Sequence, residues 1–277
     1  MHRFKKKLGQ NFLHDANIAR KIIDLAALTA GEPVFEIGPG NGFLTAFLLG
    51  VPAPVTAIET DTDLLPVLRQ RFSSGQENEF TLVHGDVLKS DLEDELGDVY
   101  QRHGKICVVA NIPYQITTPI IFLLIRYRHL FSRAVLMMQE EVAARILAAP
   151  GSKLYGRLSI MTSLFCQTMP GFTVSPGCFY PQPRVWSRVV SLHFLSQPSC
   201  QISDVEWLGD LVKRLFSQRR KKIINPLSNW KLTLERSQLA ELLLQNGFSP
   251  DCRPETMTVS ELCRLAELLQ CHVNSTF

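Results

Sequence analysis

The chain has 277 residues, of which 45% are hydrophobic and 20% are charged, and its formal net charge is +3. This length and apolar content suit a folded protein with a substantial core and about two domains. The longest apolar stretch, around residues 116–125, is too short to span a bilayer, so we do not expect a membrane protein.

Cysteine and histidine usage argues against disulfide or metal chemistry. The seven cysteines are odd in number and include no C-x-x-C pair, which argues against a disulfide framework or a structural zinc site. The seven histidines show no ligand spacing such as H-E-x-x-H. We therefore expect no metal.

The start of the chain is basic, with Arg3 and Lys5 to Lys7 ahead of a polar segment. An apolar segment would be needed at that point for a secretory signal, so we expect a cytoplasmic protein. The same residues are a weak candidate for RNA contact.

The first predicted element is a helix that begins after Asp15, which can cap it, and ends near Leu28. Its apolar residues recur at helical spacing, at Ile18, Ile22 and Leu25.

A strand, a glycine-rich loop and a helix follow, at 34–37, 38–42 and 43–49. Glycines let the backbone close against a ligand, and the start of the helix supplies free N–H groups. The next predicted strand, Val55–Ile58, ends in Glu59, about 20 residues after the loop, where a carboxylate can bind both hydroxyls of a ribose. This pattern indicates a ligand with an adenosine-like group.

Two further strands also end in polar groups. The strand at 80–83 leads to Asp86, whose carboxylate can accept from an exocyclic amine. The apolar run 106–110 leads to Asn111-Ile112-Pro113-Tyr114. Ligands bind at the carboxyl edge of open α/β sheets, so we expect these groups to share one site.

The tetrapeptide suits a planar nitrogen base held by its amino group. Asn111 offers an amide oxygen and Ile112 a backbone carbonyl, both as acceptors. Tyr114 offers a ring face for stacking, and Pro113 fixes the backbone so that the acceptors are aimed in advance.

Either a dinucleotide or S-adenosylmethionine could use such a cleft. A dinucleotide fingerprint needs G-x-G-x-x-G, whereas these glycines follow Glu36 as G-x-G-x-G. A carboxylate beside the loop would repel a pyrophosphate and suit a cationic ligand. We therefore expect S-adenosylmethionine.

Alternating strands and helices continue to Phe194, including a strand at 133–138 and a helix at 140–149. The remaining signal is helical, at 204–217, at 234–245 and after a Thr258-x-x-Glu261 capping box. We expect an α/β fold, with a Rossmann-like class I methyltransferase sheet in residues 1–197 and a small all-helical RNA-contacting domain in residues 198–277.

A basic cluster near the start of the second domain is the stronger candidate for RNA contact. Its members are Lys213, Arg214, Arg219, Arg220, Lys221 and Lys222. Contacts of this kind would reach phosphates, which gives affinity and salt dependence but no choice of sequence.

From about Leu8 to about Leu227 the chain resembles the ribosomal RNA adenine dimethyltransferases, and within them the bacterial small-subunit (KsgA-type) members. The motifs that carry the resemblance are Gly9-Gln10-Asn11-Phe12-Leu13, Glu36-Ile37-Gly38-Pro39-Gly40, Glu59-Thr60-Asp61, Gly85-Asp86, Asn111-Ile112-Pro113-Tyr114, Tyr155-Gly156-Arg157-Leu158-Ser159, Phe179-Tyr180-Pro181-Gln182-Pro183 and Gln218-Arg219-Arg220-Lys221.

The resemblance implies a set of cofactor contacts at Asn11, Leu13, Gly38, Glu59, Asp86 and Asn111. It also implies that Phe179 is a second aromatic residue stacking on the target adenine. The departures are slight. Ile112 stands where leucine is commoner, and Lys222 stands where threonine is frequent.

The implied function is the transfer of methyl groups from S-adenosylmethionine to the exocyclic amine of adenines in the RNA of a pre-small ribosomal subunit, to give dimethyladenine. We expect Asn111, Ile112, Pro113, Tyr114 and Phe179 to form the catalytic site. We expect a monomer that binds neither DNA nor a membrane.

Other interpretations stay open. A DNA adenine methyltransferase is disfavoured because the short helical tail resembles no base-reading domain. A ribosome-assembly factor for which methylation is secondary fits every residue named. A related class modifies large-subunit RNA and shares the same motifs, and only the overall similarity, including Tyr155 to Ser159, favours the small subunit.

Overall fold

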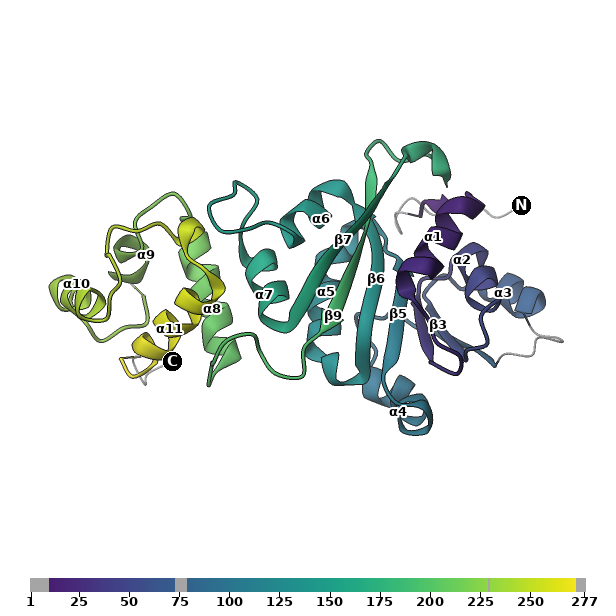
Figure 1. Ribbon diagram of the computed structural model, residues 1–277, viewed down its shortest axis with the longest axis horizontal. Coiled ribbons are helices and arrows are strands. Elements are labelled where there is room, and N and C mark those ends of the chain that lie inside the picture. The colour runs from purple at the N-terminus through teal and green to yellow at the C-terminus, as the bar shows by residue number, and fades with distance from the viewer. Residues whose placement is uncertain (1–9, 73–78, 229, 273–277) are drawn as a thin grey trace. The chain divides into compact units, whose positions relative to one another are not determined.

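The computed structural model describes residues 10–72, 79–228 and 230–272 (Figure 1). The basic residues Arg3 and Lys5 to Lys7 lie outside these ranges. The chain divides into two compact units, one made of residues up to Ala143 with Cys166–Ser196, the other of Ala144–Phe165 with the residues from Gln197 onward.

The first unit is built on a seven-stranded sheet with the strand order β4-β3-β2-β5-β6-β9-β7. The strands are β2 (Val34–Ile37), β3 (Val55–Glu59), β4 (Phe80–His84), β5 (Ile106–Asn111), β6 (Phe131–Gln139), β7 (Cys166–Val174) and β9 (Ser187–Phe194). The strands from β4 to β6 in this order pair in parallel, whereas β9 pairs antiparallel with both β6 and β7. A separate short pair joins β1 (Phe12–Leu13) to β8 (Phe179–Tyr180).

Helices cover both faces of this sheet (Figure 1). They are α1 (Ala16–Ala26), α2 (Phe43–Leu48), α3 (Leu65–Phe72), α4 (Leu92–His103), α5 (Thr117–Arg126) and α6 (Glu140–Ile146). The central strand β5 is at most 2% exposed from Ile106 to Ala110. A strand that is covered on both faces has a continuous apolar sequence, and this is the pattern from which we predict the strand at 106–110. The Rossmann-like sheet is thus confirmed, although the antiparallel arrangement of β7 and β9 was not predicted.

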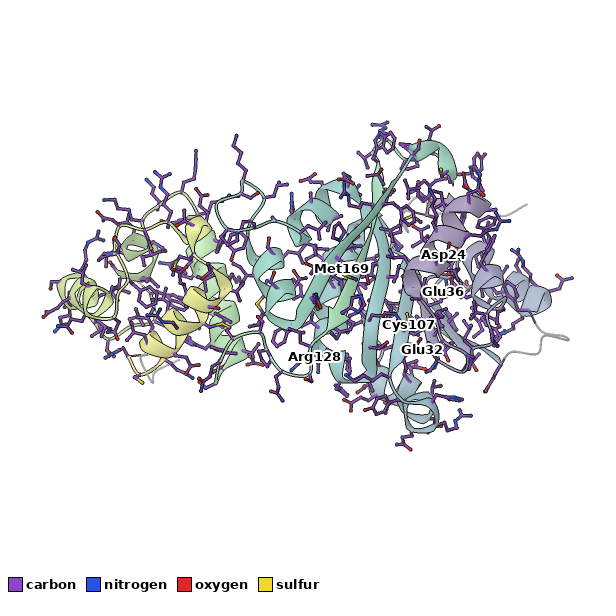
Figure 2. The ribbon with its side chains drawn as sticks, in the orientation of Figure 1. Asp24, Glu32, Glu36, Cys107, Arg128 and Met169 are labelled. Atoms are coloured by element: carbon purple, nitrogen blue, oxygen red, sulfur yellow. A yellow bond between two sulfur atoms is a disulfide. The ribbon has the colours of Figure 1, made fainter. Side chains whose placement is uncertain are left out.

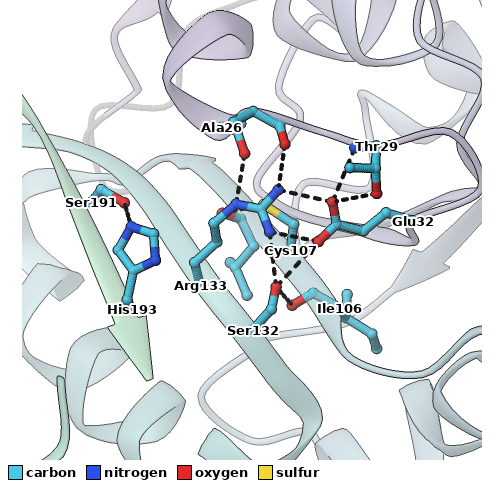
Figure 3. A network of polar contacts seen from close by, with 11 residues as sticks. Ala26, Thr29, Glu32, Ile106, Cys107, Ser132, Arg133, Ser191 and His193 are labelled. Atoms are coloured by element: carbon cyan, nitrogen blue, oxygen red, sulfur yellow. Dashed lines mark hydrogen bonds and ion pairs between the residues drawn. The ribbon is translucent and has the colours of Figure 1, made fainter. Parts of the chain in front are cut away.

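The ends of α1 are fixed by polar contacts. Asp15 caps its start, because Oδ1 accepts from the N–H groups of Asn17 and Ile18. At its end Arg133 of β6 donates to the carbonyls of Ala26 and Ala27 (Figure 3). Ala27 has φ +48°, in the left-handed region, so the helix ends at Ala26, two residues before the predicted end.

The Arg133 guanidinium also forms an ion pair with Glu32, at 2.6 Å from Nη1 to Oε1 (Figure 3). Burial opposes ionisation of this carboxyl, but hydrogen bonds from Arg133 and from the Thr29 N–H lower the pKa of Glu32. The pair ties α1 and the loop before β2 to the sheet.

The second unit is helical, with α7 (Arg157–Phe165), α8 (Val205–Phe216), α9 (Ile224–Ser228), α10 (Arg236–Gln245) and α11 (Val259–Gln270). The capping box of Thr258 and Glu261 opens α11 as predicted. The indole N–H of Trp207 donates to the Ala266 carbonyl, and its ring stacks on Trp230 at 4.6 Å between centroids. The all-helical character of this part is confirmed.

Three expectations differ from the structure. Residues 144–165, which the sequence assigns to the first domain, pack with the second unit. The helix α6 ends at Ile146 and not at Ala149. Cys200 and Cys263 form a disulfide, so the expectation of no disulfide is wrong for this pair. Their sequence separation of 63 residues follows no motif, and only the folded unit brings them together.

Within the described ranges, no helix is long and apolar enough to cross a membrane.

Candidate functional site

A cavity of about 220 Å³ lies at the carboxyl edge of the parallel strands in the first unit. Its lining includes a polar or glycine residue from the end of each of four strands, together with one residue of the segment before β1. These residues are Gly38 after β2, Glu59 of β3, Asp86 after β4, Asn111 of β5 and Asn11. The sequence-based expectation that these strand ends share one site is thus met by the fold.

Glu59 is held rigidly at the cavity wall. Its Oε2 accepts from the Gly40 N–H at 3.0 Å and its Oε1 from the Asp61 N–H at 2.8 Å. Burial raises the pKa of this carboxyl, and the two backbone hydrogen bonds oppose that rise. Each oxygen thus has one backbone donor, so the carboxylate is oriented before any ligand arrives.

Glu36 does not face the cavity, and the argument that its charge would repel a pyrophosphate is wrong. The residue (labelled in Figure 2) is 2% exposed, and its Oε2 accepts from the Thr45 hydroxyl at 2.7 Å. Burial, with a contribution from the Glu59 charge, raises the pKa of Glu36 to about 8. At neutral pH this carboxyl is therefore protonated, and it acts as a buried hydrogen-bonding group.

Two glycines shape the loop after β2. Gly38 has φ +68°, and nothing lies within 4 Å of where a Cβ would be, so its backbone is open to the cavity. Gly40 has φ +60°, and a Cβ there would come within 2.6 Å of the Phe12 ring. The loop thus needs glycine for its conformation at both positions and for packing at the second.

Asn111 is oriented by a contact from the segment before β1. Its Nδ2 donates to the Asn11 carbonyl at 3.0 Å. A carbonyl can only accept, so the amide nitrogen faces Asn11 and the amide oxygen is directed elsewhere. Asn111 can therefore present Oδ1 as an acceptor, which is the role that the sequence predicts.

Ile112 and Pro113 fix the backbone beside that amide. The Ile112 N–H donates to the Met137 carbonyl of β6, and its side chain is 1% exposed. Pro113 has φ −55° and ψ 129°. Both residues line the cavity, together with Tyr114.

Tyr114 is half-buried at the cavity and is held by its hydroxyl. The Tyr114 and Ser187 hydroxyls lie 2.8 Å apart in a hydrogen bond. Burial raises the pKa of Tyr114, so the phenol stays neutral at physiological pH. Ser187 was not among the predicted site residues, and its position 73 residues along the chain gives no local signal.

Leu13 and Phe179 lie apart from the other predicted site residues. They face each other in the β1–β8 pair, and they are 3% and 2% exposed. Neither belongs to the cavity lining, and both pack in the hydrophobic core. The contact of Leu13 with the cofactor and the stacking role of Phe179 therefore stay predictions.

Gln10 and Asp61 extend the site beyond the predicted residues. The Gln10 side chain donates to Asp61 Oδ2 at 2.8 Å, and Asp61 is 1% exposed. This contact joins the segment before β1 to the segment after β3. Both residues stand inside quoted motifs, which is the signal that could have found them.

The family is decided by comparison with known sequences. The family model described as ribosomal RNA adenine dimethylase matches residues 1–270. The chain belongs to the ribosomal RNA adenine dimethylase family. It is similar to ribosomal RNA small subunit methyltransferase A of Geobacter metallireducens, at 41% identity over 96% of both chains. The protein of the same name from Lactococcus lactis is 40% identical, over 96% of this chain and 90% of that one.

Solved structures agree with this membership of the dimethylase family. A dimethyladenosine transferase from Plasmodium falciparum has a TM-score of 0.73 and 28% identity, over 94% of this chain and 96% of that chain. The 23S rRNA methyltransferase ErmE has a TM-score of 0.69 and 25% identity, over 94% of this chain and all of that one. The cavity thus belongs to an adenine dimethylase fold.

The basic cluster of this dimethylase lies in the second unit, and half of it is engaged in internal contacts. Arg219 pairs with Glu255 at 3.0 Å and donates to the Ser152 and Lys153 carbonyls. Arg214 donates to the Pro226 carbonyl, and Lys222 pairs with Asp251 at 2.9 Å. The other members, Lys213, Arg220 and Lys221, are exposed, and so is Lys222, whose side chain is 53% exposed in its ion pair. RNA contact by all six stays a prediction, and its best candidates are Lys213, Arg220 and Lys221.

Proposed function

We propose that this chain transfers methyl groups from S-adenosylmethionine to the exocyclic amine of adenines in small-subunit ribosomal RNA, to give dimethyladenine. The observation that carries the proposal is the orientation of Asn111. Its amide nitrogen donates to the Asn11 carbonyl, which leaves the amide oxygen as an acceptor for an amine in the cavity that Ile112 also lines.

The cavity residues fit S-adenosylmethionine. Glu59 offers two oriented carboxylate oxygens, which match the two hydroxyls of a ribose. Asp86 offers a carboxylate for an amine, and the open backbone of Gly38 lets a ligand approach closely. When bound, the cofactor supplies an electrophilic methyl group on a sulfonium.

The residues around Asn111 would prepare the adenine amine as a nucleophile. Its lone pair is delocalised into the ring, so the nitrogen reacts poorly. Acceptors at Asn111 Oδ1 and the Ile112 carbonyl would bind its two hydrogens and favour a tetrahedral nitrogen with an aimed lone pair. Such orientation can lower the barrier by roughly 7–11 kcal/mol.

Tyr114 would hold the base by stacking, which contributes about 1–3 kcal/mol per base. The hydrogen bond to Ser187 fixes the phenol, so the ring is placed before the base enters. The neutral phenol adds no charge that would disturb the amine. The amine would release one proton to solvent with each methyl transferred, and no residue in this arrangement must lose a proton beforehand. A monomethylated adenine keeps one hydrogen and a lone pair on its nitrogen, so it can be accepted again.

The similarity to named proteins favours the small subunit. Relatives called ribosomal RNA small subunit methyltransferase A are 40–41% identical to the chain, whereas the 23S rRNA methyltransferase ErmE is 25% identical. We infer that the partner is the RNA of a pre-small subunit, contacted by the exposed Lys213, Arg220 and Lys221. A cytoplasmic monomer would suit this task.

The test is methylation of small ribosomal subunits taken from cells that lack the gene. The purified protein and S-adenosylmethionine should convert a defined set of adenines to dimethyladenine, measured by mass spectrometry of the digested RNA. Product confined to monomethyladenine would refute dimethylation. Methylation of large-subunit RNA or of DNA in place of small-subunit RNA would refute the substrate.

A further inference from the structure

The segment from β8 to β9 exposes three large hydrophobic side chains within seven residues. Tyr180 is 63% exposed, Val185 is 42% exposed and Trp186 is 54% exposed. Tryptophan combines a large apolar face with a polar N–H, and it is enriched where proteins recognise partners. An exposed group of this kind indicates a contact surface.

Both ends of this segment are attached to residues that line the cavity. At one end Tyr180 pairs with Phe12 in the β1–β8 ladder, and Phe12 lines the cavity. At the other end Ser187, next to Trp186, bonds to the hydroxyl of the cavity residue Tyr114. The exposed segment therefore borders the cavity: its ends are attached to lining residues, while its own residues lie outside the lining.

The backbone at Trp186 is fixed although its side chain is exposed. The Trp186 carbonyl accepts from the Glu140 N–H at 3.0 Å. The Glu140 carboxylate in turn pairs with Arg188 Nε at 2.8 Å, and Ser187 between them is buried. An aromatic ring on an ordered backbone loses little freedom when a flat group stacks on it.

The charge of the segment favours nucleic acid over a protein surface. From Phe179 to Arg188 the sequence contains no acidic residue and two arginines, of which Arg188 pairs with Glu140 and Arg184 carries the positive charge at the surface. Arg184 is exposed two residues before Trp186. An exposed aromatic ring beside an exposed cation, at the rim of a site for a base, is the arrangement that binds single-stranded RNA.

We propose that Trp186 stacks on a nucleotide that flanks the target adenine, and that it is a positioning residue for the RNA substrate. This inference rests on the proposed function, because it needs an adenine in the cavity. Trp186 does not touch the reacting atoms. Its stacking partner is a neighbouring base, held at the rim while the target base is turned into the cavity.

The first test is steady-state methylation of small ribosomal subunits by Trp186→Ala, Trp186→Phe and Trp186→Leu. Loss of one base stack should raise KM for the subunits by about 5- to 160-fold in the alanine variant, with kcat at saturation unchanged. Phenylalanine should restore most of the loss, and leucine should not, because only an aromatic face stacks. Val67→Ala is the matched control, since Val67 is 46% exposed on α3 of the same unit.

Three kinetic results would overturn the proposal. They are a wild-type KM in Trp186→Ala, a Trp186→Leu variant as good as wild type, and a Trp186→Phe variant as poor as the alanine variant. Affinity for S-adenosylmethionine should be the same in all variants, which checks that the cavity is intact.

The second test identifies the partner directly. Trp186 is replaced by the photoreactive residue p-benzoylphenylalanine, and the protein is irradiated on intact subunits. A cross-link to ribosomal RNA within a few nucleotides of the methylated adenines agrees with the proposal. A cross-link to a ribosomal protein, or none, overturns it.

The two proposals fail in different ways. If the wild-type protein forms no dimethyladenine in small subunits, the proposed function fails. If it does so and the variants behave as wild type, the assignment of Trp186 alone fails.

Discussion

The strand ends of the first unit and the basic cluster of the second unit are both dense in polar groups, but the groups are held differently. Around the cavity, each Glu59 carboxylate oxygen accepts one backbone hydrogen bond, and the Asn111 amide nitrogen donates one to a backbone carbonyl. These bonds leave the oxygens of both side chains able to accept from a ligand. In the basic cluster, internal partners occupy Arg214 and Arg219, whereas Lys222 pairs with Asp251 at the surface, where both side chains are exposed. Internal hydrogen bonds can thus orient a polar side chain for a ligand, or they can use up the atoms that a ligand would contact. The number of charges in a sequence does not distinguish these outcomes.

Asn111→Ala should have the largest effect on activity. Removal of one preorganised polar group costs about 10²–10³ in rate. Single-turnover methylation of small subunits measures this loss, and subunit affinity should barely change. A variant with full activity would remove Asn111 from the mechanism.

Glu59→Ala should weaken the binding of S-adenosylmethionine by about 10- to 100-fold, because hydrogen bonds to a charged group contribute about 1.5–3 kcal/mol. Calorimetric titration measures the affinity. Glu95→Ala, at an exposed position of α4, is the control and should bind as wild type. Unchanged affinity in Glu59→Ala would place the ribose elsewhere.

Glu36→Gln should change the dependence of stability on pH. The pKa of Glu36 is about 8 in the folded chain, against an ordinary value of 4.5. Between these values the folded state keeps a proton that the unfolded state has lost, so stability falls as pH rises, by at most about 1.4 kcal/mol per pH unit. Glutamine cannot ionise, so this fall should be smaller in the variant. Denaturant unfolding from pH 5 to pH 8 measures it, and the exposed Glu95→Gln should follow wild type.

Substitutions in the basic cluster should have smaller effects, of two kinds: some should change RNA affinity and others should change stability. Arg220→Ala with Lys221→Ala should reduce the salt dependence of RNA affinity by roughly 0.7–0.9 log units per lost phosphate contact, with unchanged thermal stability. Arg219→Ala should lower the melting temperature, because its contacts with Glu255 and the Ser152 carbonyl are lost. If all three positions alter only the salt slope, the internal contacts of Arg219 do not hold in solution.

The sequence was sufficient for the parallel strands and for the strand-end groups of the site. Each parallel strand has a local apolar pattern, and parallel strands bring their carboxyl ends together, so Glu59, Asp86 and Asn111 could be placed in one site from the sequence alone.

The remaining features depend on contacts between distant segments. Glu36 is adjacent to the glycine loop, but its burial against Thr45 depends on how α2 packs. Phe179 pairs with Leu13 in a short ladder that no sequence pattern predicts. The internal partners of Arg219 come from two other segments of the second unit. In each case the sequence identifies the residue, but the contacts that surround it could not be inferred.

The most direct test of the difference between the two regions is the methylation rate at saturating concentrations of small subunits and S-adenosylmethionine, measured in parallel for three proteins. They are the wild type, Asn111→Ala and the double variant Arg220→Ala with Lys221→Ala. We predict that the double variant reaches the wild-type rate at saturation, whereas Asn111→Ala stays about 10²–10³ slower, because only Asn111 acts on the reacting amine. Equal saturated rates for wild type and Asn111→Ala, or an equal loss in both variants, would contradict this account.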